Sequence, residues 1–234
     1  MNTPTTLVLW DIDMTLIELP GLGRRWYERA WLKAIGSELL HHPTLSGRTE
    51  RAITTELLAT HGVEQTEEFI ERMFTALEAV VAEDRGTLAQ HGRVFPGAEE
   101  ALVALGALPT VVQTLVTGNL ASVAGYKLVP FGLDAHLDFE IGGYGALSAH
   151  RPDLVAAAMR NAARKHGAAF AAESVVVIGD TPHDVEAALE HGALAVGVAT
   201  GVFSEAELRE SGAHVTFPEL SDTKAVLSAI LRQA

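Results

Sequence analysis

The chain has 234 residues, no cysteine and a formal net charge of −13. This length suits one or two compact domains, and 48% hydrophobic with 20% charged residues is typical of a soluble globular protein. The lack of cysteine excludes disulfides, iron–sulfur clusters, thiolate zinc sites and a cysteine nucleophile. The acidic balance argues against a nucleic-acid partner, because nucleic-acid binding needs a basic face.

The first apolar run, at residues 7–10, is too short for a signal sequence or a membrane span, and no basic segment precedes it. No other window approaches 18 uninterrupted apolar residues. We therefore expect a cytoplasmic protein with no membrane partner.

Most of the chain alternates between short apolar runs and helical patterns. Four compact runs have the character of strands buried on both faces: residues 7–10, 110–116, 175–178 and 193–198. A short fifth strand is expected around Val215, whereas residues 142–145 are predicted to form a loop. Apolar residues recur at helical spacing in four segments: residues 98–105, 154–162, 185–189 and 226–231. The pattern predicts an α/β fold, a Rossmann-like parallel sheet with helices on both faces.

One stretch, residues 17–95, interrupts this alternation. It contains no convincing strand but three helical patterns, of which the one at residues 69–81 is the strongest 3.6-residue repeat in the chain. We therefore predict a small all-helical domain at 17–95, inserted into an α/β core domain formed by residues 1–16 and 96–234.

Polar residues follow three of the predicted strands. Ligands bind at the carboxyl ends of strands in open parallel sheets, so these residues should converge on one edge. They are Asp11 and Asp13 after the first strand, Thr117, Gly118 and Asn119 after the second, and Asp180 and Asp184 after the third.

This set of groups suits phosphoryl transfer. Of two carboxylates spaced i, i+2, one can act as nucleophile and the other as general acid and base. Several carboxylates in one place repel each other unless a hard divalent cation lies among them, and Mg²⁺ prefers oxygen ligands. Hydroxyl and backbone N–H groups at a strand-to-helix turn suit phosphate oxygens. The expected reaction runs through an aspartyl-phosphate.

The sequence resembles the haloacid dehalogenase-like superfamily of hydrolases over nearly its whole length. Residues 11–16 match the family's Asp-x-Asp-x-Thr motif, and residues 117–119 and 179–184 match its second and fourth motifs. The helical insertion falls where the family's cap domain lies. The branch with phosphoglycolate phosphatase-like enzymes fits best.

The resemblance implies a role for each motif residue. Asp11 would be the nucleophile, and Asp13 the acid and base, with a backbone carbonyl that also binds Mg²⁺. Thr117 and Gly118 would bind the phosphoryl group in a loop that Asn119 supports. The Mg²⁺ ligands would be Asp11, Asp13, Asp180 and Asp184.

Two positions depart from the family pattern. Met14 stands where many members have glycine, and we expect its side chain at the cap interface. Arg151, before Pro152, stands where the third motif usually has lysine, so Arg151 is predicted to take that catalytic role, although the two side chains are not equivalent donors. Lys127 is a less favoured substitute because it lies in a helical pattern ahead of that motif.

The insertion carries further candidates for substrate recognition. Arg48 lies in a glycine-containing loop that resembles the cap's specificity loop, and it is predicted to bind phosphate. Anion recognition would then depend on Mg²⁺, Arg151 and a few arginines of the insertion. Phosphonate-cleaving members use a cap lysine, here Lys33, but they lack the second aspartate of the first motif, so Asp13 favours phosphate esters.

The leading interpretation is a Mg²⁺-dependent phosphatase, a phosphoric monoester hydrolase that acts on a small phosphorylated metabolite. Two alternatives remain open. One is a phosphomutase of the sugar-phosphate type on the same scaffold. The other is a non-catalytic binding protein that retains the fold, against which the intact carboxylate set argues.

Overall fold

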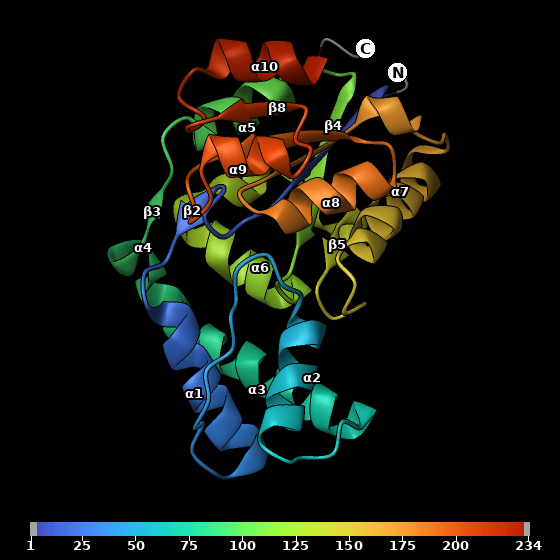
Figure 1. Cartoon of the computed structure of the whole chain (residues 1–234). Helices are drawn as coiled ribbons and strands as arrows, with labels where there is room; N and C mark the ends of the chain where they lie inside the picture. The colour runs from blue at the N-terminus through green and yellow to red at the C-terminus, as the bar shows by residue number, and fades with distance from the viewer. Residues whose placement is uncertain (1–3, 232–234) are drawn as a thin grey trace.

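The computed structural model describes residues 4–231 and contains a six-stranded sheet in the order β5-β4-β1-β6-β7-β8, with every neighbouring pair parallel (Figure 1). Its strands are β1 (Thr6–Trp10), β4 (Val111–Thr117), β5 (Gly143–Tyr144), β6 (Val175–Gly179), β7 (Leu194–Val198) and β8 (Val215–Phe217). The four predicted runs and the strand around Val215 are all confirmed. The α/β sheet prediction is therefore correct.

Helices cover both faces of this sheet, and β1 shows why. Its side chains alternate, so that Val8 and Trp10 pack on one face while Leu7 and Leu9 pack on the other. The first face is covered by α5 (Ala98–Gly106), α6 (Ala121–Leu128) and α10 (Thr223–Leu231). The second is covered by α7 (Pro152–His166), α8 (Pro182–Glu190) and α9 (Glu205–Glu210). Burial on both faces explains why β1 is apolar throughout.

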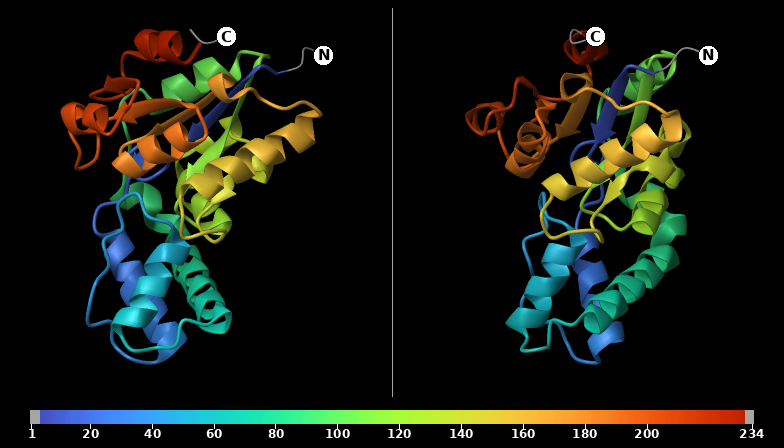
Figure 2. Two further views of the ribbon diagram at one scale, coloured as in Figure 1. Left: turned by 45° about the vertical axis from the view of Figure 1, so that its right-hand side comes forward. Right: turned by 90° about the vertical axis from the view of Figure 1, so that its right-hand side faces the viewer.

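The three helical patterns of the insertion form the helices α1 (Leu22–Ile35), α2 (Glu50–Thr60) and α3 (Glu67–Asp84), followed by the short α4 (Leu88–His91). They enclose a second core that includes Trp26, Trp31 and Met73 and extends to Leu120 and Val123 at α6. Side-chain caps mark two helix starts, because the hydroxyls of Thr49 and Thr66 accept backbone N–H groups. In Figures 1 and 2 this bundle extends away from the sheet as a separate layer.

Two expectations about strands are wrong. The insertion does contain strand residues, because β2 (Ile17–Glu18) pairs antiparallel with β3 (Arg93–Val94) where the chain leaves the core and returns to it. Residues 142–145 are not wholly a loop, because β5 pairs with β4 and forms the edge of the sheet. Strands of two residues are too short to show a periodicity.

Short 3₁₀ helices complete the chain at Arg85–Thr87, Val129–Phe131, Leu133–His136, Phe139–Ile141 and Ala172–Ser174. Among residues 4–231, no helix combines the length and the apolar character needed to cross a membrane.

Candidate active site

The carboxyl ends of β1, β4 and β6 meet at a cavity of about 440 Å³ that separates the sheet from the helical insertion. Asp11, Asp13, Thr117, Asn119 and Asp180 all line it. The predicted residues that follow the three strands are therefore brought together, as expected for one edge of a parallel sheet.

Asp11, Asp180 and Asp184 form a buried acidic group. One carboxylate oxygen from each lies within 4.8 Å of the others. Burial, together with repulsion from Asp184 and Asp11, raises the pKa of Asp180 to about 9, against the opposing effect of Arg151. Burial also raises the pKa of Asp11 to about 6, against the opposing effect of Arg151. Three buried carboxylates that repel one another can together offer oxygen ligands to a hard divalent cation.

Arg151 is the cation built into this group. Its Nη2 lies 2.6 Å from Asp184 Oδ1 and 3.0 Å from Asp11 Oδ1, and the side chain is buried. Burial alone would lower the pKa of Arg151, but Asp184 and Asp11 raise it above its usual range. Its Nη1 also donates to the carbonyl of Gly47 in the insertion, at 3.1 Å. Arg151 thus links the acidic group to the insertion. The sequence analysis expected this arginine to take the place of the lysine of the third motif.

Asp184 has a second task beside its pairing with Arg151. Its other carboxylate oxygen accepts the backbone N–H and the hydroxyl of Thr181 at 3.1 and 2.7 Å, and so completes a capping box at the start of α8. The capping interaction explains how α8 holds this carboxylate at the site.

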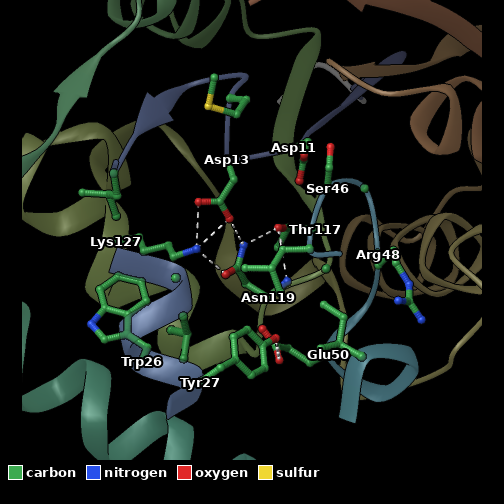
Figure 3. Close-up of a pocket in the computed structure, with 18 of the residues that line it drawn as sticks. Asp11, Asp13, Trp26, Tyr27, Ser46, Arg48, Glu50, Thr117, Asn119 and Lys127 are labelled. Atoms are coloured by element: carbon green, nitrogen blue, oxygen red, sulfur yellow. Dashed lines mark hydrogen bonds and ion pairs between the residues drawn. The ribbon is translucent and has the colours of Figure 1, made fainter. Parts of the chain in front are cut away.

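Asp13 faces a different environment. Its carboxylate, 46% exposed, accepts two hydrogen bonds from Lys127 Nζ at 2.6 and 2.8 Å and one from Asn119 Nδ2 at 2.8 Å (Figure 3). Lys127 also donates to Asn119 Oδ1, and Asn119 donates to the Thr117 hydroxyl. The side chain of Asp13 is therefore held toward this network and is not part of the acidic group.

The sequence analysis gave Lys127 less weight than Arg151, but Lys127 is also part of the site. Its side chain is only 8% exposed and lies in the cavity wall, so the site contains both Arg151 and Lys127 and not one in place of the other. The signal was present, because Lys127 shares the buried face of α6 with Val123, Ala124 and Leu128. A lysine on an apolar helix face needs a partner, and Asp13 supplies it.

Gly118 allows the insertion to approach the core. A Cβ at this position would lie 2.0 Å from the carbonyl oxygen of Arg48, so any other residue would push the two segments apart. The carbonyl of Gly118 accepts the backbone N–H of Glu50 at 2.9 Å, and Arg51 N donates to Gly145 O at 3.0 Å. The start of α2 is thereby docked on the sheet edge.

Arg48 makes no ion pair with the acidic group of Asp11, Asp180 and Asp184. Its guanidinium lies 2.5 Å from Glu56 and is turned away from Asp11 (Figure 3). Other arginines of the insertion are likewise paired: Arg24 with Glu28, Arg29 with Glu83 and Asp84, Arg51 with Glu67, and Arg93 with Glu18. Lys33 pairs with Glu83 on the surface. Within the described chain, the cations that pair with the predicted site carboxylates are therefore Arg151, beside Asp11 and Asp184, and Lys127, beside Asp13.

Tyr27 and Glu50 are site residues that the sequence did not reveal. Both are buried in the insertion wall of the cavity, and the Tyr27 hydroxyl donates to Glu50 Oε2 at 2.5 Å. Trp26 is buried and also lines the cavity, with Lys127 Nζ 5.6 Å from its ring centroid. Helical periodicity marks these residues as inward-facing and does not separate core from cavity.

Met14 lies at the cavity with a left-handed backbone, at φ 61°. This conformation costs an L-residue with a side chain about 1 kcal/mol, which gives a physical reason for glycine at this position in similar sequences.

The sequence model of the haloacid dehalogenase-like hydrolases matches residues 8–189. The chain belongs to this family of hydrolases. The matched segment contains all three motifs, the insertion and both site cations. Among curated proteins, none matches the sequence significantly.

Solved structures share the fold at low identity. A predicted phosphatase from Clostridium acetobutylicum is 18% identical with a TM-score of 0.65, over 96% of this chain and 99% of that one. A hydrolase from Pseudomonas syringae is 22% identical with a TM-score of 0.64, over 97% and 99%. A protein described as a beta-phosphoglucomutase, from Bacteroides vulgatus, is 18% identical with a TM-score of 0.64, over 99% and 91%. These likenesses extend the fold assignment to nearly the full chain.

Proposed function

We propose that this hydrolase is a Mg²⁺-dependent phosphatase that releases phosphate from a small phosphorylated metabolite through an aspartyl-phosphate on Asp11. The observation that carries the proposal is the contrast between the two carboxylates after β1. Asp11 is buried beside Arg151 and the other acids, whereas Asp13 is half exposed beside Lys127. Two like groups in different environments can divide nucleophilic and acid–base work.

The metal would be held by Asp11, Asp180 and Asp184, with Asp13 contributing as the family resemblance implies. The buried oxygens and the raised pKa values of Asp11 and Asp180 support this assignment. When bound, Mg²⁺ supplies positive charge against the phosphoryl oxygens and offsets repulsion among the carboxylates.

The remaining steps fall to side chains of the chain itself. Asp11 attacks phosphorus and forms a bond to it, while Asp13 gives a proton to the departing ester oxygen. Asp13 then takes a proton from the water that hydrolyses the aspartyl-phosphate. Arg151 and the Thr117 hydroxyl stabilise charge on the phosphoryl oxygens, and Lys127 with Asn119 orients Asp13.

The insertion would act as a cap over this chemistry. Its docking through Gly47, Arg48 and Glu50 onto Arg151 and Gly118 supports a role in limiting access by water and large substrates. Movement of the insertion about β2 and β3 would admit the substrate.

Removal of the metal tests the proposal. We expect the purified protein to release phosphate from p-nitrophenyl phosphate with Mg²⁺, to lose this activity in EDTA, and to regain it when excess Mg²⁺ is added. Activity that survives EDTA would contradict the proposed metal dependence.

A phosphomutase is the second candidate, supported by the docking of the insertion, which would shield a phosphorylated Asp11 from water. Release of inorganic phosphate from a sugar phosphate, measured beside formation of its isomer, separates the two. A non-catalytic binding protein is the third reading, and it would be favoured if Mg²⁺ failed to raise the melting temperature.

A further inference from the structure

The cavity has a second wall whose chemistry differs from that of the acidic group. On the insertion side it is lined mainly by apolar side chains: Leu19, Trp26, Ile53, Leu77 and Val81. Tyr27 and Glu50 lie among them, reaching toward each other in Figure 3. If Asp11 attacks phosphorus as proposed, the organic part of the ester would lie in the cavity beside this wall.

Glu50 is the unusual member of this wall. It is 7% exposed, and its carboxylate accepts a hydrogen bond from the Tyr27 hydroxyl. No cation of the described chain lies within ion-pair distance of it. Burial raises the pKa of Glu50 to about 7, although the Tyr27 hydrogen bond and the charge of Lys127 oppose the rise. A carboxylate in such an apolar wall is costly unless a cation reaches it.

The nearby cations are committed elsewhere. Lys127 is engaged by both oxygens of Asp13 and by Asn119, and Arg151 by Asp11 and Asp184. Arg24 and Arg48, which also line the cavity, pair with Glu28 and Glu56. A substrate with a second anionic group at its far end would meet Glu50 and no free cation of the described chain.

A cationic group on the substrate would be attracted to Glu50, in contrast to an anionic one. An ammonium group beside Glu50 would gain a charge-assisted hydrogen bond in a desolvated wall, where such bonds are strong. A short hydrocarbon chain between that ammonium and the phosphate would lie against the apolar side chains.

We infer that the organic part of the substrate is a short apolar chain that ends in an ammonium group, which Glu50 binds with the help of Tyr27. This inference rests on the proposed phosphatase function. It makes Glu50 a specificity-determining residue, and it predicts discrimination against phosphate esters that carry a carboxylate.

Three esters of matched length provide the test: 3-aminopropyl phosphate, propyl phosphate and 3-phosphonooxypropanoate. Their dissociation constants are measured by calorimetry with Mg²⁺ on the Asp11→Asn protein, so that binding is recorded apart from turnover. We expect the amine to bind most tightly and the carboxylate most weakly, about tenfold or more apart. Equal or tighter binding of the carboxylate ester would overturn the inference.

The same titrations on a protein that also carries Glu50→Gln should abolish the preference for the amine over propyl phosphate. Glu71→Gln, at an exposed carboxylate on α3, is the matched control and should preserve it. A preference that survives Glu50→Gln would contradict the assignment. Comparison of the three esters on the Asp11→Asn protein remains decisive if the Glu50 variant fails to fold.

The proposed function and the inference fail in different ways. If the wild-type protein hydrolyses no phosphate ester, including p-nitrophenyl phosphate, the phosphatase proposal fails whatever the binding order. If it hydrolyses the aryl phosphate but binds the three esters equally, the inference fails and the phosphatase proposal stands.

Discussion

The two walls of the cavity were built by different means. The core wall consists of polar side chains set at the ends of β1, β4 and β6, where the carboxylates are matched by Arg151 and Lys127. The insertion wall is mainly apolar along α1, α2 and α3, and Glu50 is the buried acid among its described residues. In the proposed function, the core wall would hold the reacting groups in place, while the insertion wall would select what is attached to the phosphate.

Loss of the proposed nucleophile should affect the core wall most. Asp11→Asn is expected to lower turnover of p-nitrophenyl phosphate by about 10⁴-fold or more, the scale seen when a catalytic nucleophile is removed. Phosphate release at saturating substrate measures the effect. Asp134→Asn, at an aspartate outside the cavity, should leave the rate unchanged. A modest loss in Asp11→Asn would mean that the acidic wall is not the reacting wall.

Removal of Arg151 should break the charge balance of the same wall. Arg151→Met leaves Asp11 and Asp184 without their buried cation, and we expect the free energy of unfolding in EDTA to fall by about 3–5 kcal/mol. Denaturant titration provides the measurement. Arg160→Met, on the exposed face of α7, should change stability by no more than about 0.5 kcal/mol. Similar losses in both variants would show that the buried cation has no special role.

The orientation of Asp13 on the core wall depends on Lys127. Lys127→Met frees the Asp13 carboxylate, and we expect turnover of the aryl phosphate to fall by about 10- to 100-fold, as for residues that orient a functional group. The change should fall mainly on kcat, because Lys127 contacts Asp13 and not Thr117, which is proposed to bind the phosphoryl group. Lys33→Met is the control, since Lys33 pairs with Glu83 on the surface. An unchanged kcat would remove Lys127 from the mechanism.

The smallest effect is expected at Met14. Glycine would remove about 1 kcal/mol of backbone strain from the folded state. It would also increase the conformational entropy of the unfolded chain, which lowers the free energy of unfolding by a similar amount. Met14→Gly should therefore alter stability by less than about 1 kcal/mol while opening the cavity to bulkier esters. A melting curve and the KM values for two esters of different size measure the two effects. A large loss of stability would contradict this account of the backbone.

Much of the fold followed from the sequence, because its strands are long enough to be continuous apolar runs and its helices long enough to repeat. The carboxylates after β1 and β6 could be placed together because the ends of parallel strands share one edge. The strands β2, β3 and β5 were missed, since two residues carry no periodic signal.

The insertion wall could not be predicted in the same way. Tyr27 and Glu50 come from different helices, and their hydrogen bond depends on how α1 and α2 pack. The pairing of Arg48 with Glu56 also depends on that packing and turns its guanidinium away from the phosphate site that the sequence suggested. Local motifs reveal strand-end chemistry, whereas contacts between helices require the tertiary structure.

In the proposed mechanism, Asp11 carries the phosphoryl group during turnover. Protein mixed briefly with Mg²⁺ and a radiolabelled phosphate ester can be quenched with acid, digested and mapped by mass spectrometry. We expect label on the peptide that contains Asp11, and no label on that peptide in the Asp11→Asn protein. Rapid release of phosphate without label on that peptide, or label on another residue, would contradict it.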